Sequence, residues 1–457
     1  MSTIQSPSPL SIPNIRRFIA FRIFFNARFY YPVFTILFVD FGLTLSQFAL
    51  LNAVWAATIV ILEVPSGALA DILGRRKLLV ATSGIMVVEI LILCVVPRGR
   101  PELLFAVFVA NRILSGCAEA AASGADEAIA YDSLKQAGRE ADWGRVLELQ
   151  MRLQAAVHIG AMIIGAAVYD PALMQRVARW MNIQVVLTQA DTLRLPLWLT
   201  LGMAVGALAV SLGMEEPKNP DNAPAGPVPL AQAFRLTLDA GRWILTTPFA
   251  LVVIASGMFF DHVLRMMLTL NSQYYRLIQL PEASFGLIGA AMAGLGIMVP
   301  RAARIMADRL APGLNFAILG ILGFSSLAAM VPAIPFLGLI PVAGLVTGMY
   351  LNGFFLSHYL NRIADSRRRA TILSFRGLAF NLAYGGIGVF YALLLSRLRT
   401  GSGAGPVLDP GLEEQVFALS LEWFPGYFLA GFVVLAWFAR WRLGRGGSGG
   451  ADPGVRG

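Results

Sequence analysis

Long apolar runs follow one another along the chain, separated by short segments that carry most of its charge. Each run holds about 20 residues, enough to cross ~30 Å of hydrocarbon as an α-helix. A lipid-facing backbone must satisfy its own hydrogen bonds, so only helices or a closed barrel can span a membrane. The sequence shows none of the alternation that is typical of barrel strands. The pattern therefore predicts an all-α membrane protein.

The apolar runs predict twelve transmembrane helices in two sets of six. They lie near residues 17–40, 47–69, 78–97, 102–125, 151–169, 196–214, 246–270, 284–303, 313–331, 333–356, 371–395 and 415–439. The narrowest separation is at Val331 and Pro332, between the ninth and tenth spans. The boundaries of single spans are the least certain part of this layout.

The spacing of the runs also predicts the domain organisation. We expect an N-terminal cytoplasmic tail, a first six-helix bundle, a cytoplasmic linker, a second bundle and a disordered cytoplasmic tail, at residues 1–16, 17–214, 215–245, 246–439 and 440–457. The first half of the linker is rich in proline, which favours an extended, solvated chain. Its second half has the pattern of an amphipathic helix lying on the membrane surface.

One predicted outer loop, residues 170–195, contains a helix signal of its own. Asp170 is a residue type that caps helix N-termini, and Pro171 suits the first helical position. A short helix is therefore expected to begin at Pro171. The sequence does not indicate what this helix does.

Composition supports the membrane assignment. Hydrophobic residues make up 57% of the chain and charged residues only 14%, against roughly 25% charged residues in soluble proteins. The net charge is +9, but Lys and Arg concentrate in alternate short loops. This bias orients helices in a bilayer and predicts both termini in the cytoplasm, in an inner membrane. It therefore argues against nucleic acid as a partner.

The sequence carries no signature of an enzyme, cofactor or metal site. Cys94 and Cys117 both fall inside apolar runs, which is typical of small buried hydrophobes rather than of a disulfide or metal pair. The histidines are on three separate spans: His158, His262 and His358. No nucleophile–base set or metalloprotease motif accompanies them. We expect no enzymatic activity, no cofactor and no metal.

A charged stretch, GALADILGRRK at residues 67–77, lies between the second and third spans. It resembles motif A of the major facilitator superfamily, and the matching residues are Gly67, Leu69, Asp71, Gly74, Arg75, Arg76 and Lys77. The run from Arg112 to Gly116 resembles that superfamily's motif B. Residues 123–135 and 367–374 are similar to inner loops of bacterial members. The resemblance implies a drug/proton-antiporter-like member with two pseudo-symmetric six-helix bundles.

The resemblance also implies that the motif A loop latches the inner face of the protein. Asp71 and Arg75 are four residues apart, a spacing at which an ion pair can form. Either Asp126 or Asp132, at the inner end of the fourth span, is a further candidate partner for Arg75. Gly67 lets helices approach closely. For Arg76 and Lys77, a role in setting membrane orientation alone stays open.

Several charged residues fall inside predicted spans, where charge is expensive and marks function. The candidates on the spans that line the central cavity in the family are Arg28, Arg112, Glu119, Asp261, His262 and Arg265. Glu89 is a further charged residue of this kind and lies midway along the third span.

The roles of these candidates leave alternatives open. Glu119 is the best candidate for a proton-carrying carboxylate, or it is a structural partner of Arg112 seven residues away. Asp261 is a second proton-carrying candidate, or it pairs with Arg265 at i, i+4. His262 can titrate near neutral pH, or it is a hydrogen-bonded packing residue.

The leading functional hypothesis is a monomeric secondary active transporter that exports a small molecule, a drug or metabolite, in exchange for protons by alternating access. The fifth span lacks the proline of the antiporters' motif C, which weakens the case for antiport. One alternative is uptake or facilitated diffusion of an organic anion, with Arg28, Arg112 and Arg265 as clamps. Another is a receptor or scaffold that has the fold but no transport activity.

Overall fold

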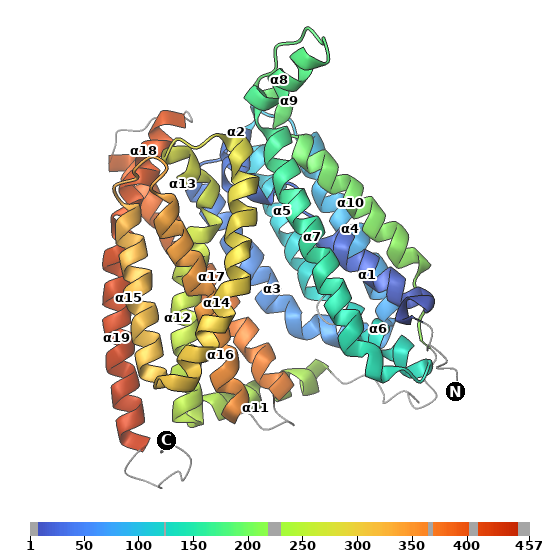
Figure 1. Cartoon of the computed structure of the whole chain (residues 1–457), viewed down its shortest axis with the longest axis vertical. Helices are drawn as coiled ribbons and strands as arrows, with labels where there is room; N and C mark the ends of the chain where they lie inside the picture. Colours follow the sequence, from blue (N-terminus) through green and yellow to red (C-terminus); the bar gives the residue numbers. More distant parts are fainter. Residues whose placement is uncertain (1–7, 123–124, 218–229, 364–368, 402–409, 447–457) are drawn as a thin grey trace, which may run out of the picture. The chain divides into compact units, whose positions relative to one another are not determined.

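The computed structural model describes residues 8–122, 125–217, 230–363, 369–401 and 410–446. Every regular element in these ranges is a helix. The chain divides into two compact units (Figure 1). The first unit contains Met1–Ala233 and Pro281–Ala290, and the second contains Phe234–Leu280 and Ala291–Gly457. The two units are described separately below.

The helices confirm the predicted all-helical membrane architecture. Among the described residues, 11 helices are long and apolar enough to cross a membrane. The predicted spans from 47–69 to 415–439 each overlap one of them. The predicted span 17–40 is the exception. It is broken into α1 (Pro13–Asn26), a 3₁₀ turn η2 (Tyr31–Val33) and α2 (Phe34–Phe41).

The first unit is built on α1 and α2 with eight further α-helices. These are α3 (Leu45–Leu73), α4 (Arg75–Val95), α5 (Pro101–Ala122), α6 (Ala125–Gln136), α7 (Trp143–Tyr169), α8 (Pro171–Trp180), α9 (Gln189–Thr192) and α10 (Leu195–Gly213), with 3₁₀ turns at Pro9–Ser11, Glu140–Asp142 and Glu282–Ser284. The helix α5 packs against α3 and α4, and α10 packs against α1 and α4. Their shared core holds Phe21, Phe25, Met86, Ala118 and Ala204.

The second unit is built around α12, which packs against α16, α17 and α19. Its helices are α11 (Leu230–Thr246), α12 (Pro248–Thr269), α13 (Asn271–Leu277), α14 (Phe285–Arg309), α15 (Pro312–Met330), α16 (Leu339–Ile363), α17 (Arg369–Gly401), α18 (Pro410–Leu421) and α19 (Trp423–Gly446). The first turns of α11 and α14 belong to the first unit. Phenylalanine rings pack closely on glycines here, as Phe428 does on Gly323, so the helices approach one another closely.

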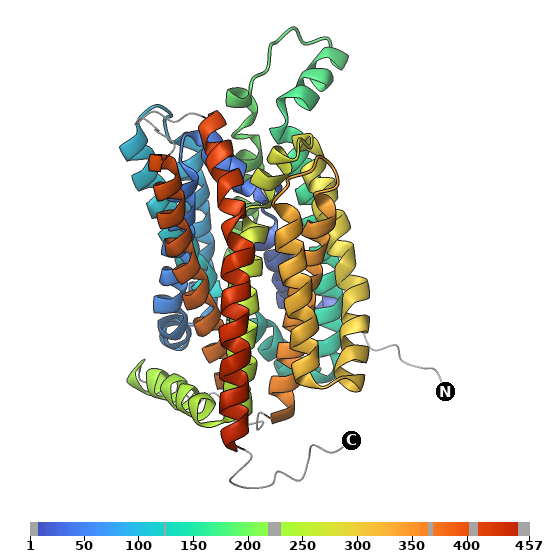
Figure 2. The ribbon, with the colours of Figure 1, turned by 90° about the vertical axis from the view of Figure 1, so that its left-hand side faces the viewer.

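Two shorter helices confirm predictions made from local signals. Asp170 accepts hydrogen bonds from the backbone N–H groups of Ala172 and Leu173, and α8 begins at Pro171 as expected. Figure 1 shows α8 and α9 standing beyond the ends of α7 and α10. The predicted amphipathic segment forms α11, which runs across the end of α19 rather than along it (Figure 2). The proline-rich half of the linker, residues 218–229, lies outside the described residues.

Candidate functional site

The break in the first span lies at Arg28, and Pro32 explains its position. Proline has no N–H group, so Pro32 cannot donate to the Arg28 carbonyl one turn earlier, and its ring crowds that carbonyl. Instead, the Tyr31 N–H donates to the Arg28 carbonyl at 3.3 Å and closes a tighter turn. The helix therefore opens at a charged residue within the predicted span.

The Arg28 side chain forms a buried ion pair with Glu89 of α4. Arg28 Nη1 lies 2.5 Å from Glu89 Oε1, and the exposed fractions of the two side chains are 4% and 0%. The Arg28 guanidinium also lies over the Phe25 ring, 5.6 Å from its centroid. Charges this deeply buried persist in proteins when they are paired and hydrogen-bonded. Arg28 and Glu89 neutralise each other, so Glu89 belongs to the site.

The backbone beside Arg28 is fixed by two neighbouring helices. The Phe29 N–H donates to the Thr200 hydroxyl of α10 at 3.1 Å. On the other side, Gly165 of α7 lies so close that a Cβ there would collide with the Phe29 carbonyl. Only glycine fits such an approach. The break is therefore a packed element of the first unit.

Arg112 lies one helix away and is held by its sequence neighbour. Its Nε and Nη2 donate to Asn111 Oδ1 at 3.0 and 2.7 Å, and the guanidinium lies 5.4 Å from the centroids of the Phe34 and Phe38 rings. Asn111 Nδ2 in turn donates to the Glu89 backbone carbonyl at 2.8 Å. Asn111 thus links Arg112 to the helix that carries Glu89.

Of the two roles left open for Glu119, that of a partner of Arg112 is wrong. Arg112 is buried, whereas Glu119 is exposed and makes no ion pair within the described chain. Seven residues bring side chains to the same helix face only approximately, and the aromatic rings of α2 hold Arg112 elsewhere. Glu119 nevertheless lies close enough to Arg28 and Glu89 for their charges to interact.

A second charged cluster lies on α12 in the second unit. Arg265 Nη2 is 2.5 Å from Asp261 Oδ2, the i, i+4 pair anticipated from the sequence. Arg265 Nη1 also donates to Asn381 Oδ1 of α17 at 3.2 Å, and its guanidinium lies over the Tyr384 ring at 5.2 Å. The helix ends at Thr269, and α13 begins two residues later. The pair in the first unit therefore lies beside an interrupted span, whereas the pair in the second unit lies within a continuous one.

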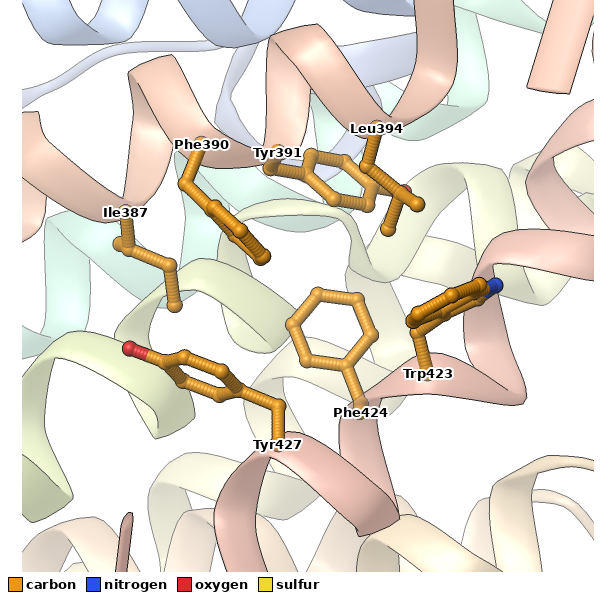
Figure 3. Close-up of a pocket in the computed structure, with 7 residues that line it drawn as sticks. All are labelled: Ile387, Phe390, Tyr391, Leu394, Trp423, Phe424 and Tyr427. Atoms are coloured by element: carbon orange, nitrogen blue, oxygen red, sulfur yellow. The ribbon is translucent and has the colours of Figure 1, made fainter. Parts of the chain in front are cut away.

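His262 is buried in the second unit and fully hydrogen-bonded. Its Nδ1 lies 3.0 Å from the Met258 carbonyl and its Nε2 lies 2.9 Å from the Tyr427 hydroxyl. Tyr427 also lines an aromatic pocket between α17 and α19 (Figure 3), with its hydroxyl turned away from Trp423. Both ring nitrogens are occupied, so the geometry favours the packing interpretation of His262.

The motif A loop is held by contacts inside the first unit. Gly74 makes the turn between α3 and α4 at φ = 88°, a conformation that favours glycine. The Glu216 carboxylate accepts from the backbone N–H groups of Arg75 and Arg76 at 3.2 and 2.8 Å. A carboxylate at a helix N-terminus is favourable because of the helix dipole. Residue 216 had been expected in a solvated linker, so this cap was missed.

Asp132 is the acidic partner of Arg75, through Arg75 Nη1 and Asp132 Oδ2. The alternative partner, Asp126, is instead 3.2 Å from Arg22 Nη1, and Arg22 also contacts Glu127. Asp126 is nearly fully buried, and the positive charge of Arg22 compensates its negative charge. The structure describes the helical backbone at Gly67 and Asp71, but not the surroundings of Gly67 or the side chain of Asp71.

Within the described ranges, no group of three His, Cys, Asp or Glu side chains is arranged to hold a metal ion. The polar clusters are instead ion pairs and hydrogen bonds between helices.

The Major Facilitator Superfamily model matches residues 18–388. The chain belongs to this superfamily. Its structure is similar to that of a bacterial homologue of the human lysosomal transporter Spinster, in an inward-facing, unoccupied conformation, with a TM-score of 0.68, 15% identity and coverage of 96% and 97% of the two chains. It is also similar to the nucleoside transporter NupG, with a TM-score of 0.67, 14% identity and coverage of 96% and 99%. No curated protein matches the sequence.

The superfamily match makes this chain an integral membrane transporter rather than an enzyme. At this identity, the two solved structures show the shared fold and not a shared substrate. The residues that sequence reasoning left out of the site are Glu89, Asn111, Asn381, Tyr384 and Glu216. Glu89 could have been included from the sequence, because it is a charged residue within an apolar run. The others are polar residues whose partners are distant in sequence.

Proposed function

We propose that this transporter exports a small cationic or neutral organic compound in exchange for protons. The observation that carries the proposal is the buried Arg28–Glu89 pair beside the break in the first span. A buried pair of one carboxylate and one arginine has no net charge. When the carboxylate binds a proton, the pair gains one positive charge. Because a change in buried charge is expensive, it can be coupled to a change of conformation.

The state of the acidic and basic side chains supports a cation or a neutral molecule as the substrate. Arg28 and Arg112 are buried and engaged with Glu89 and Asn111. Glu119 is exposed and unpaired within the described chain, so it is available to a positively charged group. Export is supported by the resemblance of motifs A and B to those of bacterial drug/proton antiporters.

The motif A contacts support a gating role for the Arg75 loop. Arg75 is bound by Asp132 and, through its backbone, by Glu216. We propose that these contacts form in one state of the transport cycle and break in another. The distribution of Lys and Arg supports an orientation with both termini in the cytoplasm. We propose a monomer in a bacterial inner membrane.

The test is flux in liposomes that contain only the purified protein. Ethidium, a fluorescent organic cation, is the probe, and a pH gradient is imposed in either direction. Export by proton exchange predicts that ethidium accumulates on the acidic side and that the gradient dissipates faster when ethidium is present. Ethidium movement that is indifferent to the gradient, or none with a panel of cations, contradicts the proposal.

A second candidate function is transport of an organic anion, and Arg265 favours it. Arg265 is 29% exposed, and it already binds a carboxylate and the amide of Asn381. A substrate carboxylate is able to replace Asp261 on such a guanidinium. Anion transport predicts that Arg265→Gln abolishes flux, whereas cation export predicts that Arg265→Gln retains ethidium exchange.

A further inference from the structure

Glu89 is buried, and only one of its two carboxylate oxygens is hydrogen-bonded among the described residues. Its Oε1 binds Arg28, whereas its Oε2 is shielded from solvent and has no hydrogen-bond partner among the described residues. An unsatisfied buried oxygen costs free energy. The cost falls when a proton binds, since a protonated carboxyl group carries no charge and can donate a hydrogen bond. Both the burial and the open oxygen suit a group that binds and releases a proton.

We propose that Glu89 is the proton-binding group of this transporter, and that Arg28 moves from Glu89 to Glu119 when Glu89 is protonated. The inference rests on the proposed proton coupling and names its residues. It replaces Glu119, the carboxylate favoured from the sequence, by Glu89 as the group that carries the proton. Glu119 becomes the second site for the arginine.

The charges around Glu89 are consistent with this exchange. On the first span, Arg28 pairs with Glu89, and Tyr31 interacts with Arg28, Glu89 and Glu119. On α5, Glu119 interacts with both Arg28 and Glu89, while Arg112 is held by Asn111. The other described titratable groups on the helices packed against α4 are Glu63 on α3, Glu102 and Cys117 on α5, and Asp126, Glu127, Tyr131, Asp132 and Lys135 on α6. Arg22 of α1 binds Asp126 and Glu127, and Arg75 binds Asp132.

Those remaining groups are already paired, or they have no interaction with Glu89 in the structure. Glu119 is therefore the carboxylate available to Arg28. His158 of α7 contacts the Tyr31 ring and not the ion pair.

The step balances as a single proton transfer. Neutral Glu89 forms when the carboxylate takes one proton from water, and Arg28 stays protonated. The positive charge of Arg28 is then matched by the Glu119 carboxylate. Release of the same proton to water restores the Arg28–Glu89 pair. No other bond forms or breaks, so one proton is carried in each cycle.

The break in the first span lets Arg28 change partner without unwinding a helix. The Arg28 carbonyl is already outside the regular helical hydrogen-bond pattern because of Pro32. The adjacent Phe29 N–H is held by Thr200, which provides a fixed point beside a movable residue. Such breaks lie at coupling sites in other transporters.

The experiment measures proton binding directly and does not depend on transport. Infrared difference spectra of the full-length protein in lipid, recorded between alkaline and acid pH, report the carbonyl stretch of protonated carboxyl groups. We expect the native protein to show one band of a buried carboxyl group, resolved from those of the surface carboxyl groups that also protonate at acid pH. This band should be lost in Glu89→Gln and retained in Glu119→Gln. A band that persists in Glu89→Gln overturns the assignment of the proton to Glu89.

The exchange of partners has its own readout in the melting temperature. Glu119→Gln removes the second site, so protonated Glu89 leaves Arg28 unpaired. The melting temperature of this variant should match that of the native protein at alkaline pH and fall below it at acid pH. Equal melting temperatures at both pH values overturn the exchange. The double variant Arg28→Gln/Glu89→Gln, which keeps a neutral pair of similar size, is the folding control.

These outcomes are separate from those of the ethidium assay. If ethidium flux fails but the infrared band follows Glu89, the substrate or direction is wrong and the proton site stands. If flux is proton-driven but the band survives in Glu89→Gln, the proposed function stands and this inference fails.

Discussion

The two arginine–carboxylate pairs differ in how they are made. Arg28 and Glu89 come from different helices, and both side chains are almost fully buried. Asp261 and Arg265 lie one turn apart on α12, and 29% of the arginine side chain remains exposed. The comparison shows that a pair within one helix leaves its arginine open to other ligands, whereas a pair between helices can be sealed.

The same difference separates their expected roles. Under the proposal made above, the sealed pair in the first unit binds a proton, which is small enough to reach it. In the open pair of the second unit, Arg265 also contacts Asn381 and Tyr384. These polar groups could therefore rearrange around a substrate. Four sets of substitutions test the contrast.

The largest expected effect is loss of one partner from each pair. Glu89→Ala in a Glu119→Gln background leaves Arg28 buried and unpaired, which should lower the free energy of unfolding by about 3–5 kcal/mol. Asp261→Ala leaves Arg265 with Asn381 and partial exposure, so the loss should be nearer about 1.5–3 kcal/mol. Denaturation of the detergent-purified proteins measures both. Equal losses would remove the distinction between a sealed and an open pair.

Close packing around the break gives the next effect. A Cβ at Gly165 meets the backbone of Phe29, which cannot move aside, so Gly165→Ala should cost at least about 3 kcal/mol. In the second unit, a Cβ at Gly257 meets the end of the Leu356 side chain at 2.7 Å, which can rotate. Gly257→Ala should therefore cost about 1 kcal/mol. Gly160→Ala, with nothing within 4 Å, is the control, and its thermal stability should be equal or slightly higher because alanine favours a helix.

The two asparagines offer a third comparison. Asn111 accepts two hydrogen bonds from Arg112 and donates one to the Glu89 carbonyl, all in a buried setting. Asn111→Ala should destabilise the protein by about 2–3 kcal/mol. Asn381 accepts one bond from the partly exposed Arg265, so Asn381→Ala should cost about 1 kcal/mol. The reverse order in urea denaturation would contradict the assignment of the tighter network to the first unit.

The smallest expected effect is at Tyr427. Tyr427→Phe keeps the ring in the aromatic pocket and removes the hydroxyl that lies against His262 Nε2. His262 keeps its contact with the Met258 carbonyl, so the cost should be about 0.5–1.5 kcal/mol. Ethidium flux should stay within about two-fold of the native rate if His262 is a packing residue. A pH-dependent loss of flux would instead indicate that His262 titrates in the cycle.

The sequence by itself determined most of the fold. Apolar runs about 20 residues long must become helices in a bilayer, because no other open structure satisfies the backbone there. Local signals also predicted structure correctly. Asp170 and Pro171 predicted the start of α8, and the i, i+4 spacing of Asp261 and Arg265 indicated that they can form an ion pair. Each of these depends on residues within one or two helical turns.

Only the tertiary structure decided which distant charges meet. Glu89 reaches Arg28 across 61 positions of sequence, and Glu216 reaches the start of α4 across 140. Hydropathy assigns a residue to a span but not to a face of the helix, so a pairing of Arg112 with Glu119 stayed open in the sequence and is absent from the described structure. The rotation and packing of each helix depend on side chains from all its neighbours at once. That is why the transporter fold could be predicted from the sequence, whereas the partner of the buried Arg28 could not.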